Sequence, residues 1–208
     1  MIFLTKPTLI IQTSPLHTAS TVLVNGLYGM IPELSEMNVV YYADCWDENQ
    51  YDEETFEDYL VLESSNAFED IVVVKSHHTR LSYYMGKYGD YYNVFFVSSE
   101  RKEKGSPEYL FPDKYRNLDN LILFDYEEIN ERETYTVEDI VSCMYEKLNQ
   151  TIPNIEFDIA GGVARIEGMN ARYEEIKEMP FEYVDEFYRI HGSHRNRTHH
   201  IPTNPYWK

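Results

Sequence analysis

The feature that most constrains the fold is an alternation of short apolar runs with segments of helical spacing. The runs are rich in Val, Ile and Phe, which favours strands, and the segments between them carry cap residues and one apolar face. Strands that alternate with helices pair in parallel, and near-continuous apolar character is typical of strands covered on both faces. The predicted strands are Thr8–Thr13, Asn38–Tyr42, Asp70–Lys75, Asn93–Ser98 and Asn120–Asp125.

Helices are predicted between and after these strands. The first, Thr18–Met30, has its apolar residues on one face, although Gly26 and Gly29 weaken the helical pattern, and we predict that it packs closely on the sheet. Thr136 has the side chain of a helix cap and precedes two acidic residues, which is typical of a helix start. The other predicted helices are Asp52–Leu62, Thr136–Asn149 and one from Pro180 to Ile190, before Gly192.

Length and composition predict one domain, residues 1–208, and the alternation of strands and helices predicts that its sheet is mostly parallel. A chain of 208 residues with 43% hydrophobic content can bury one sizeable core. Two cysteines are too few for a disulfide framework, and we find neither a leader segment nor an apolar stretch of about 20 residues. We therefore predict a cytoplasmic protein without a membrane partner. The net charge of −18 disfavours nucleic acid as a partner.

The loop after the first strand carries the clearest candidate site. It leads directly into a helix, whose first amides and dipole favour an anion, and Ser and Thr hydroxyls add donors. The loop lacks the glycines and the lysine of the common nucleotide triphosphatase loop, and an ordinary Ser/Thr helix cap is the alternative explanation. The candidate anion-binding residues are Ser14, His17, Thr18, Ala19, Ser20 and Thr21.

Two further strands end in polar side chains. The strand that ends at Lys75 is followed by His77 and His78, and ligand crevices in parallel sheets lie outside such strand ends. We predict that His77 is a base and that Lys75 neutralises a departing phosphate; a capping or solvated histidine pair is the alternative. The next strand leads through Ser98 to Arg101, which is either a second phosphate ligand or a solvated loop charge.

The order of these motifs resembles the nucleotide-dependent sulfotransferases. That family has a strand-loop-helix with a Ser-Pro…Ser-Thr loop, then a strand ending Lys-Ser-His, then a strand ending in Ser/Arg. The segment Leu123–Ile129 is similar to the family's Tyr-Glu-Asp/Glu-Leu segment. The resemblance spans about residues 8 to 150, and its specificity lies in the order and spacing of short motifs.

The resemblance implies a three-layer α/β/α sandwich with a P-loop NTPase-like fold. It also implies 3′-phosphoadenosine 5′-phosphosulfate (PAPS) as the donor, with no metal required. The acceptor would be a hydroxyl of a sugar, a phenol or a small alcohol. The sequence departs from the family in the loop, where His17 and Ala19 stand in place of Lys or Arg and Gly. The implied catalytic residues are His77, Lys75 and His17. The implied donor ligands are the loop residues 17–21 for the 5′-phosphosulfate and Ser98, Arg101, Arg195 and Arg197 for the 3′-phosphate.

Three other interpretations remain open. Asp44 and Asp47 follow the second predicted strand and would hold a divalent cation in a nucleotide-sugar glycosyltransferase. The atypical loop also fits a nucleotide-binding or interaction module without turnover. A transition metal could bind the C-terminal histidines, although their spacing matches no standard zinc pattern. These histidines are His191, His194, His199 and His200.

Overall fold

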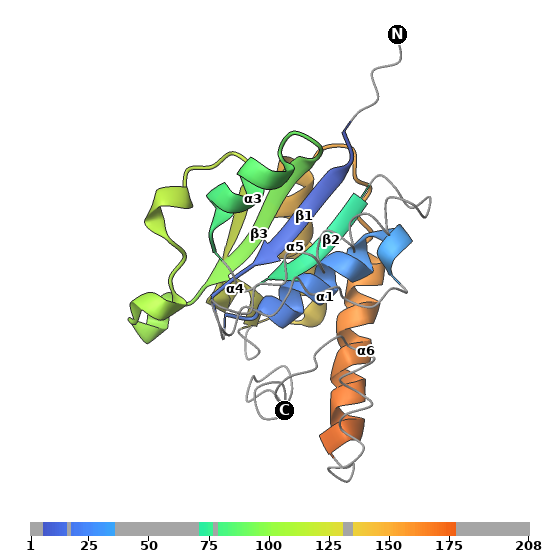
Figure 1. The fold of residues 1–208 in the computed structure, drawn as a ribbon. Coiled ribbons are helices and arrows are strands. Elements are labelled where there is room, and N and C mark those ends of the chain that lie inside the picture. Colours follow the sequence, from blue (N-terminus) through green and yellow to red (C-terminus); the bar gives the residue numbers. More distant parts are fainter. Residues whose placement is uncertain (1–5, 16–17, 36–70, 77–78, 131–134, 178–208) are drawn as a thin grey trace.

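The computed structural model describes residues 6–15, 18–35, 71–76, 79–130 and 135–177. Its centre is a four-stranded, all-parallel sheet with the strand order β2-β1-β3-β4 (Figure 1). The parallel α/β architecture predicted from the alternation of strands and helices is therefore confirmed. The strands are β1 (Thr8–Thr13), β2 (Ile71–Ser76), β3 (Asn93–Glu100) and β4 (Leu121–Asp125).

All four strands end at the same edge of the sheet, which brings their polar terminal residues together. The register pairs Gln12 of β1 with Lys75 of β2 on one side and with Val97 of β3 on the other. Because successive side chains in a strand point to opposite faces, Gln12 and Lys75 share one face of the sheet, and Thr13 and Ser76 share the other.

One face of the sheet is covered by three helices. They are α1 (Ser20–Met30), α5 (Val137–Thr151) and α6 (Ile159–Lys177). Their buried residues form one core with Ile10, Val73, Val97 and Phe124 from the four strands. In Figure 1, α6 begins beside α1 and its C-terminal half extends away from the sheet. The helix α5 starts at a capping box: Thr136 accepts from the Asp139 amide, and Asp139 accepts from the Thr136 amide.

The other face is covered by α3 (Leu81–Tyr88) and by the long connection between β3 and β4. Tyr84 of α3 and Phe111 and Tyr115 of the connection pack on Phe96 of β3 in a second core. The shorter elements are the 3-10 helices η1 (Pro32–Leu34), η2 (Lys102–Lys104), η3 (Pro107–Tyr109) and η4 (Asp113–Tyr115), and the five-residue helix α4 (Tyr126–Asn130). Helices on both faces give the chain three layers.

The glycines of α1 lie at contacts with other helices. A Cβ on Gly29 would lie 2.6 Å from the carbonyl oxygen of Gly161 and 2.9 Å from the Cα of Gly162, both in the first turn of α6. A Cβ on Gly26 would lie 2.6 Å from the Cε of Met144 in α5. Since two helix backbones approach this closely only without a side chain between them, Gly29 determines how α6 packs on α1.

The predicted and observed elements agree in most of the described chain. β1 has the predicted bounds, the other three strands shift by one or two residues, and α1 begins at Ser20, two residues later than predicted. The sequence prediction missed α3 and α6. The predicted strand Asn38–Tyr42 and the predicted helices at 52–62 and 180–190 lie outside the described residues. In the described part of the chain, none of the helices combines the length and the apolar character needed to cross a membrane.

We predict that Gly29→Ala and Gly168→Ala change stability in opposite directions. The new methyl group at position 29 meets backbone atoms of α6, and overpacking of this kind costs about 1–3 kcal/mol in the free energy of unfolding. Gly168 lies on an exposed part of α6, and no atom of the described residues lies within 4 Å of the new Cβ, so alanine should stabilise the helix by about 0.5–1 kcal/mol. Urea unfolding of both variants measures the two effects; equal effects would contradict this packing.

Candidate anion-binding site

The end of the turn from β1 into α1, at Ala19, leaves helix amides that could bind an anion. Ala19 precedes the helix in the left-handed conformation, with φ 64° and ψ 23°, and its carbonyl accepts from the amides of Val22 at 3.0 Å and Leu23 at 3.2 Å. The N-cap residue is Ala19, and within the described residues no side chain caps the helix, so the predicted alternative of a Ser/Thr cap does not describe this turn. Among the described residues, the amides of Ser20 and Thr21 meet no backbone acceptor, which leaves donors at the positive end of the helix dipole.

A buried cluster of polar side chains lies behind this turn. The Ser14 hydroxyl accepts from the side-chain amide of Gln12 at 2.7 Å and from the backbone amide of Ser99 at 3.0 Å. The Ser99 hydroxyl lies 3.0 Å from the hydroxyl of Thr18, which itself donates to the carbonyl of Pro15 at 2.7 Å. Gln12, Ser14, Thr18 and Ser99 are all 0% exposed. The loop is therefore tied to both β1 and β3.

Lys75 enters the site from the neighbouring strand. Its side chain is only 2% exposed, and its Nζ donates to the hydroxyl of Thr21 at 3.2 Å. Thr21 lies in the first turn of α1, so the buried ammonium group stands next to the helix start. A cation in this place adds to the positive field of the helix dipole.

At the end of β3 the structure has two more strand residues than predicted, where the sequence indicated a loop. The strand continues through Ser98 and Ser99 to Glu100, and all three are buried. The hydroxyl of Ser98 has no hydrogen-bond partner among the described residues. Arg101 follows the strand, donates to Glu103, and stacks with its guanidinium 4.0 Å from the ring centre of Tyr126.

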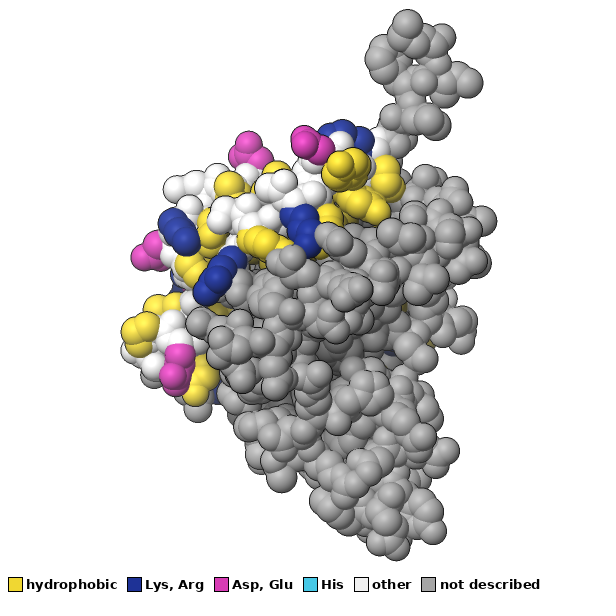
Figure 2. All heavy atoms as spheres, in the orientation of Figure 1, with side chains coloured by type: hydrophobic (Ala, Val, Ile, Leu, Met, Phe, Trp, Pro, Cys, Tyr) yellow, Lys and Arg dark blue, Asp and Glu magenta, His cyan; other side chains and the backbone are white. Residues whose placement is uncertain are grey.

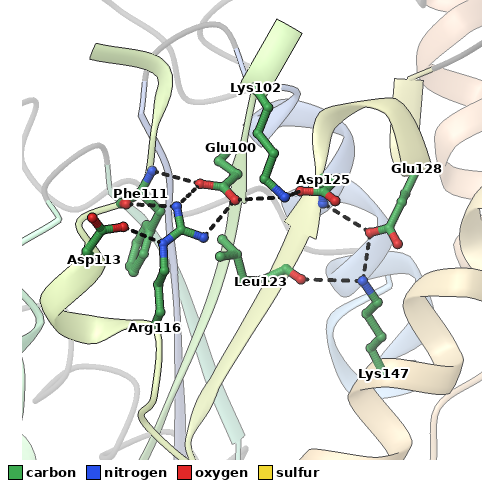
Figure 3. Close-up of polar contacts among 9 residues, drawn as sticks. All are labelled: Glu100, Lys102, Phe111, Asp113, Arg116, Leu123, Asp125, Glu128 and Lys147. Atoms are coloured by element: carbon green, nitrogen blue, oxygen red, sulfur yellow. Dashed lines mark hydrogen bonds and ion pairs between the residues drawn. The ribbon is translucent and has the colours of Figure 1, made fainter. Parts of the chain in front are cut away.

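Glu100 forms the centre of an ion-pair network at the sheet edge (Figure 3). Its carboxylate, which is 0% exposed, accepts from two nitrogens of Arg116 and from the amide of Phe111 at 3.2 Å. Lys102 lies 3.3 Å from the same carboxylate and 2.5 Å from that of Asp125. In Figure 3 the contacts continue from Asp125 through Glu128 to Lys147 of α5. The network fixes the β3–β4 connection against the end of the sheet.

The pKa of Glu100 reflects two opposing effects. Burial raises the pKa of a carboxyl group because it disfavours the charged form. The hydrogen bonds from Arg116 and from the Phe111 amide, together with the charge of Arg116, lower it by more, so the pKa of Glu100 lies below its ordinary value. Glu100 is therefore a carboxylate at neutral pH, and its charge is matched within the network.

The negative charge of the chain is unevenly distributed along the sequence. Segment 36–70, which lies outside the described residues, holds twelve of the 36 acidic residues and neither Lys nor Arg. On the face drawn in Figure 2, Lys and Arg side chains lie among hydrophobic ones, with acidic side chains scattered between them. The described part of the protein is thus less acidic than the net charge of −18 suggests.

The structure brings part of the predicted site together. Ser14, Thr18, Ala19, Ser20, Thr21 and Lys75 lie in or against the turn, while His17, His77, Arg195 and Arg197 lie outside the described residues. Sequence reasoning missed Gln12 and Ser99. Both are polar residues inside otherwise apolar strands, and that signal could have identified them.

Comparison of the chain with family models, with curated proteins and with solved structures finds no match.

We predict that Ala19→Gly leaves stability unchanged or raises it, whereas Ala164→Gly lowers it by about 0.5–1 kcal/mol. Ala19 has a left-handed backbone, which costs a residue with a Cβ about 1–2 kcal/mol, and glycine removes that cost at the expense of a buried methyl group. Ala164 is exposed within α6 and has only helix propensity to lose. Thermal unfolding compares the variants; an equal loss in both would contradict the left-handed turn.

We also predict that Glu100→Gln is less stable than the native protein at pH 7, by about 1–3 kcal/mol, because Arg116 loses a charged acceptor. Since the folded pKa of Glu100 is depressed, its contribution is present above the unfolded pKa of about 4.3 and is lost as the pH falls through the lower folded value. The stability difference between the two proteins should therefore shrink on acidification below about pH 4. Urea unfolding from pH 7 to pH 2.5 measures it, with the exposed Glu108→Gln as the control. A difference that stays constant with pH would contradict the ion pair.

Proposed function

We propose that this protein is a sulfotransferase that moves a sulfuryl group from PAPS to a hydroxyl acceptor. One observation carries the proposal: the buried Lys75, at the end of β2, contacts Thr21 in the first turn of α1. This contact joins two motifs that lie 54 residues apart in the sequence and that both belong to the sulfotransferase resemblance. It supports a single site for the phosphosulfate, formed by the loop, the helix start and the lysine.

The position of the lysine supports an anionic ligand at this site. Its ammonium group is buried at the start of α1, where it contacts the hydroxyl of Thr21. A phosphosulfate bound at the helix start would add negative oxygens within the reach of the same Nζ, where the surrounding dielectric is low and the attraction is strong.

The sheet supports the family's P-loop-like fold as part of the same proposal. Ligands of open parallel sheets bind outside the carboxyl ends of the strands, and the polar residues of β1, β2 and β3 gather at that edge. The backbone conformation of Ala19 also concerns the position where the sulfotransferases have glycine and this chain has alanine. Alanine adopts here the conformation that glycine reaches more easily, so the missing glycine does not remove the turn.

The proposed reaction is an in-line displacement at sulfur. The acceptor oxygen loses its proton to His77 and forms a bond to sulfur, while the bond from sulfur to the 5′-phosphate oxygen breaks. 3′-Phosphoadenosine 5′-phosphate leaves with the electron pair of that bond, and Lys75 neutralises the charge that develops on its leaving oxygen. His77 and the loop residue His17 keep the roles that the resemblance implies. Catalysis is then mostly positioning and electrostatic stabilisation.

We predict that 3′-phosphoadenosine 5′-phosphate stabilises the protein against heating and that Lys75→Gln weakens this effect. A ligand at 100 times its dissociation constant adds about 2.7 kcal/mol, which corresponds to roughly 5–10 °C in Tm for a chain of this size. Loss of one charge-assisted contact should reduce the affinity about 10- to 100-fold. Lys114→Gln removes the same charge from an exposed position and should bind like the native protein.

Three results separate the possible outcomes of this experiment. No stabilisation of the native protein would refute the sulfotransferase proposal. Equal weakening by Lys75→Gln and Lys114→Gln would show that net charge, and not the site, controls binding. Stabilisation without release of 3′-phosphoadenosine 5′-phosphate from PAPS, with a simple phenol and a monosaccharide as acceptors, would favour a nucleotide-binding module without turnover.

A further inference from the structure

Ser99 holds the anion loop from the neighbouring strand, although it has no part in the proposed reaction. It is the penultimate residue of β3 and is 0% exposed. Its backbone amide donates to the hydroxyl of Ser14 at 3.0 Å, and its own hydroxyl lies 3.2 Å from that oxygen. The same hydroxyl donates to the carbonyl of Thr18 and lies 3.0 Å from the Thr18 hydroxyl. One side chain thus meets the residues near both ends of the loop.

The contacts of Ser14 indicate that it also helps to hold the loop in place. Its oxygen accepts from the Ser99 amide and from the side-chain amide of Gln12 at 2.7 Å, which occupies both lone pairs. The side chain is also 0% exposed, so its hydroxyl is turned into the protein. Ser14 was predicted from the sequence to bind the donor, and its described contacts also connect the loop to β1 and β3.

The loop needs such support because of the residue that follows Thr18. Ala19 has a left-handed backbone at a cost of about 1–2 kcal/mol, and a strained residue keeps its conformation only where its surroundings impose it. Ser99 holds the carbonyl of Thr18, and that carbonyl belongs to the peptide group that joins Thr18 to Ala19. Fixing this peptide group also fixes the direction of the amides at the start of α1.

We propose that Ser99 is a positioning residue: acting through Ser14 and Thr18, it keeps the loop in the conformation that accepts an anion before any ligand arrives. The identity of that anion, the phosphosulfate of PAPS, rests on the proposed function. Preorganised donors bind more tightly because no ordering cost remains to be met on binding. Loss of the Ser99 hydroxyl should therefore loosen the helix start and weaken ligand binding, while the rest of the fold stays intact.

The test compares Ser99→Ala and Ser14→Ala with Ser142→Ala, which removes a half-buried hydroxyl from α5. Native-state hydrogen exchange is measured on the ligand-free proteins at the amides of Val22 and Leu23, which donate to the Ala19 carbonyl. We expect exchange there to be about tenfold faster in both loop variants. The Ile140 amide, which donates to Thr136 in the first turn of α5, should exchange at the native rate in all three variants.

Affinity for 3′-phosphoadenosine 5′-phosphate, measured by calorimetry, provides the second readout. It should fall about tenfold in Ser99→Ala and stay unchanged in Ser142→Ala. Unchanged exchange at Val22 and Leu23 would overturn the proposal, and so would equal acceleration at Ile140, which would indicate general destabilisation. A native protein that does not bind the nucleotide refutes the sulfotransferase proposal alone, because faster exchange confined to the helix start would still establish the positioning role.

Discussion

The structure depends on the central place of β1, which forms parallel hydrogen-bonded pairs with β2 on one side and β3 on the other. Parallel pairing aligns the carboxyl ends of all three strands, so whatever follows β1 must lie between the ends of its two neighbours. The chain that follows β1 is the loop into α1. A lysine from β2 and a serine from β3 reach this loop because the register places the ends of both strands beside it.

This arrangement places polar side chains on a helix-covered face of the sheet, where side chains are usually apolar. Gln12, Lys75 and Ser99 occupy positions on the face that α1 covers, and each is buried. Buried polar groups destabilise a fold unless hydrogen bonds compensate for them. Here Ser14 accepts from the Gln12 amide nitrogen, Thr18 meets the Ser99 hydroxyl, and Thr21 in the first turn of α1 accepts from Lys75. Loop and strand ends therefore form one unit. Elsewhere α1 is held by apolar contacts and by its close approach to α6 at Gly29.

Much of the fold could be predicted because strand periodicity is a local signal. The runs in β1 and β2 are continuous, apolar and β-branched, and tertiary contacts did not override them. α3 was missed because its inward positions are Leu81, Tyr84 and Tyr88; tyrosine is ambiguous in a pattern, and Gly86 weakens the propensity. α6 was missed because Gly161 and Gly162 look like a turn, and only their contact with α1 explains them.

The candidate site was predictable to the extent that it depends on strand ends. Lys75 was identified because it closes an apolar strand, and parallel pairing then placed it at the loop. The role of Ser99 could not be predicted, since Ser98 and Ser99 look like the start of a loop, and only the pairing of β3 with β4 extends the strand through them. Neighbouring residues then have different surroundings: Ser99 meets the loop, whereas Glu100 points to the opposite face and pairs with Arg116.

That separation explains how β3 can end in the buried carboxylate of Glu100 and still lie beside a candidate anion-binding site. Glu100 and Ser99 lie on opposite faces of β3, and Arg116 and Lys102 both contact the carboxylate. A matched ion pair has a field that falls off faster than that of a single charge, so little of the negative potential of Glu100 reaches the start of α1. At the loop itself, the dipole of α1 and the ammonium group of Lys75 both contribute a positive field, and that sign is the one that an anion requires.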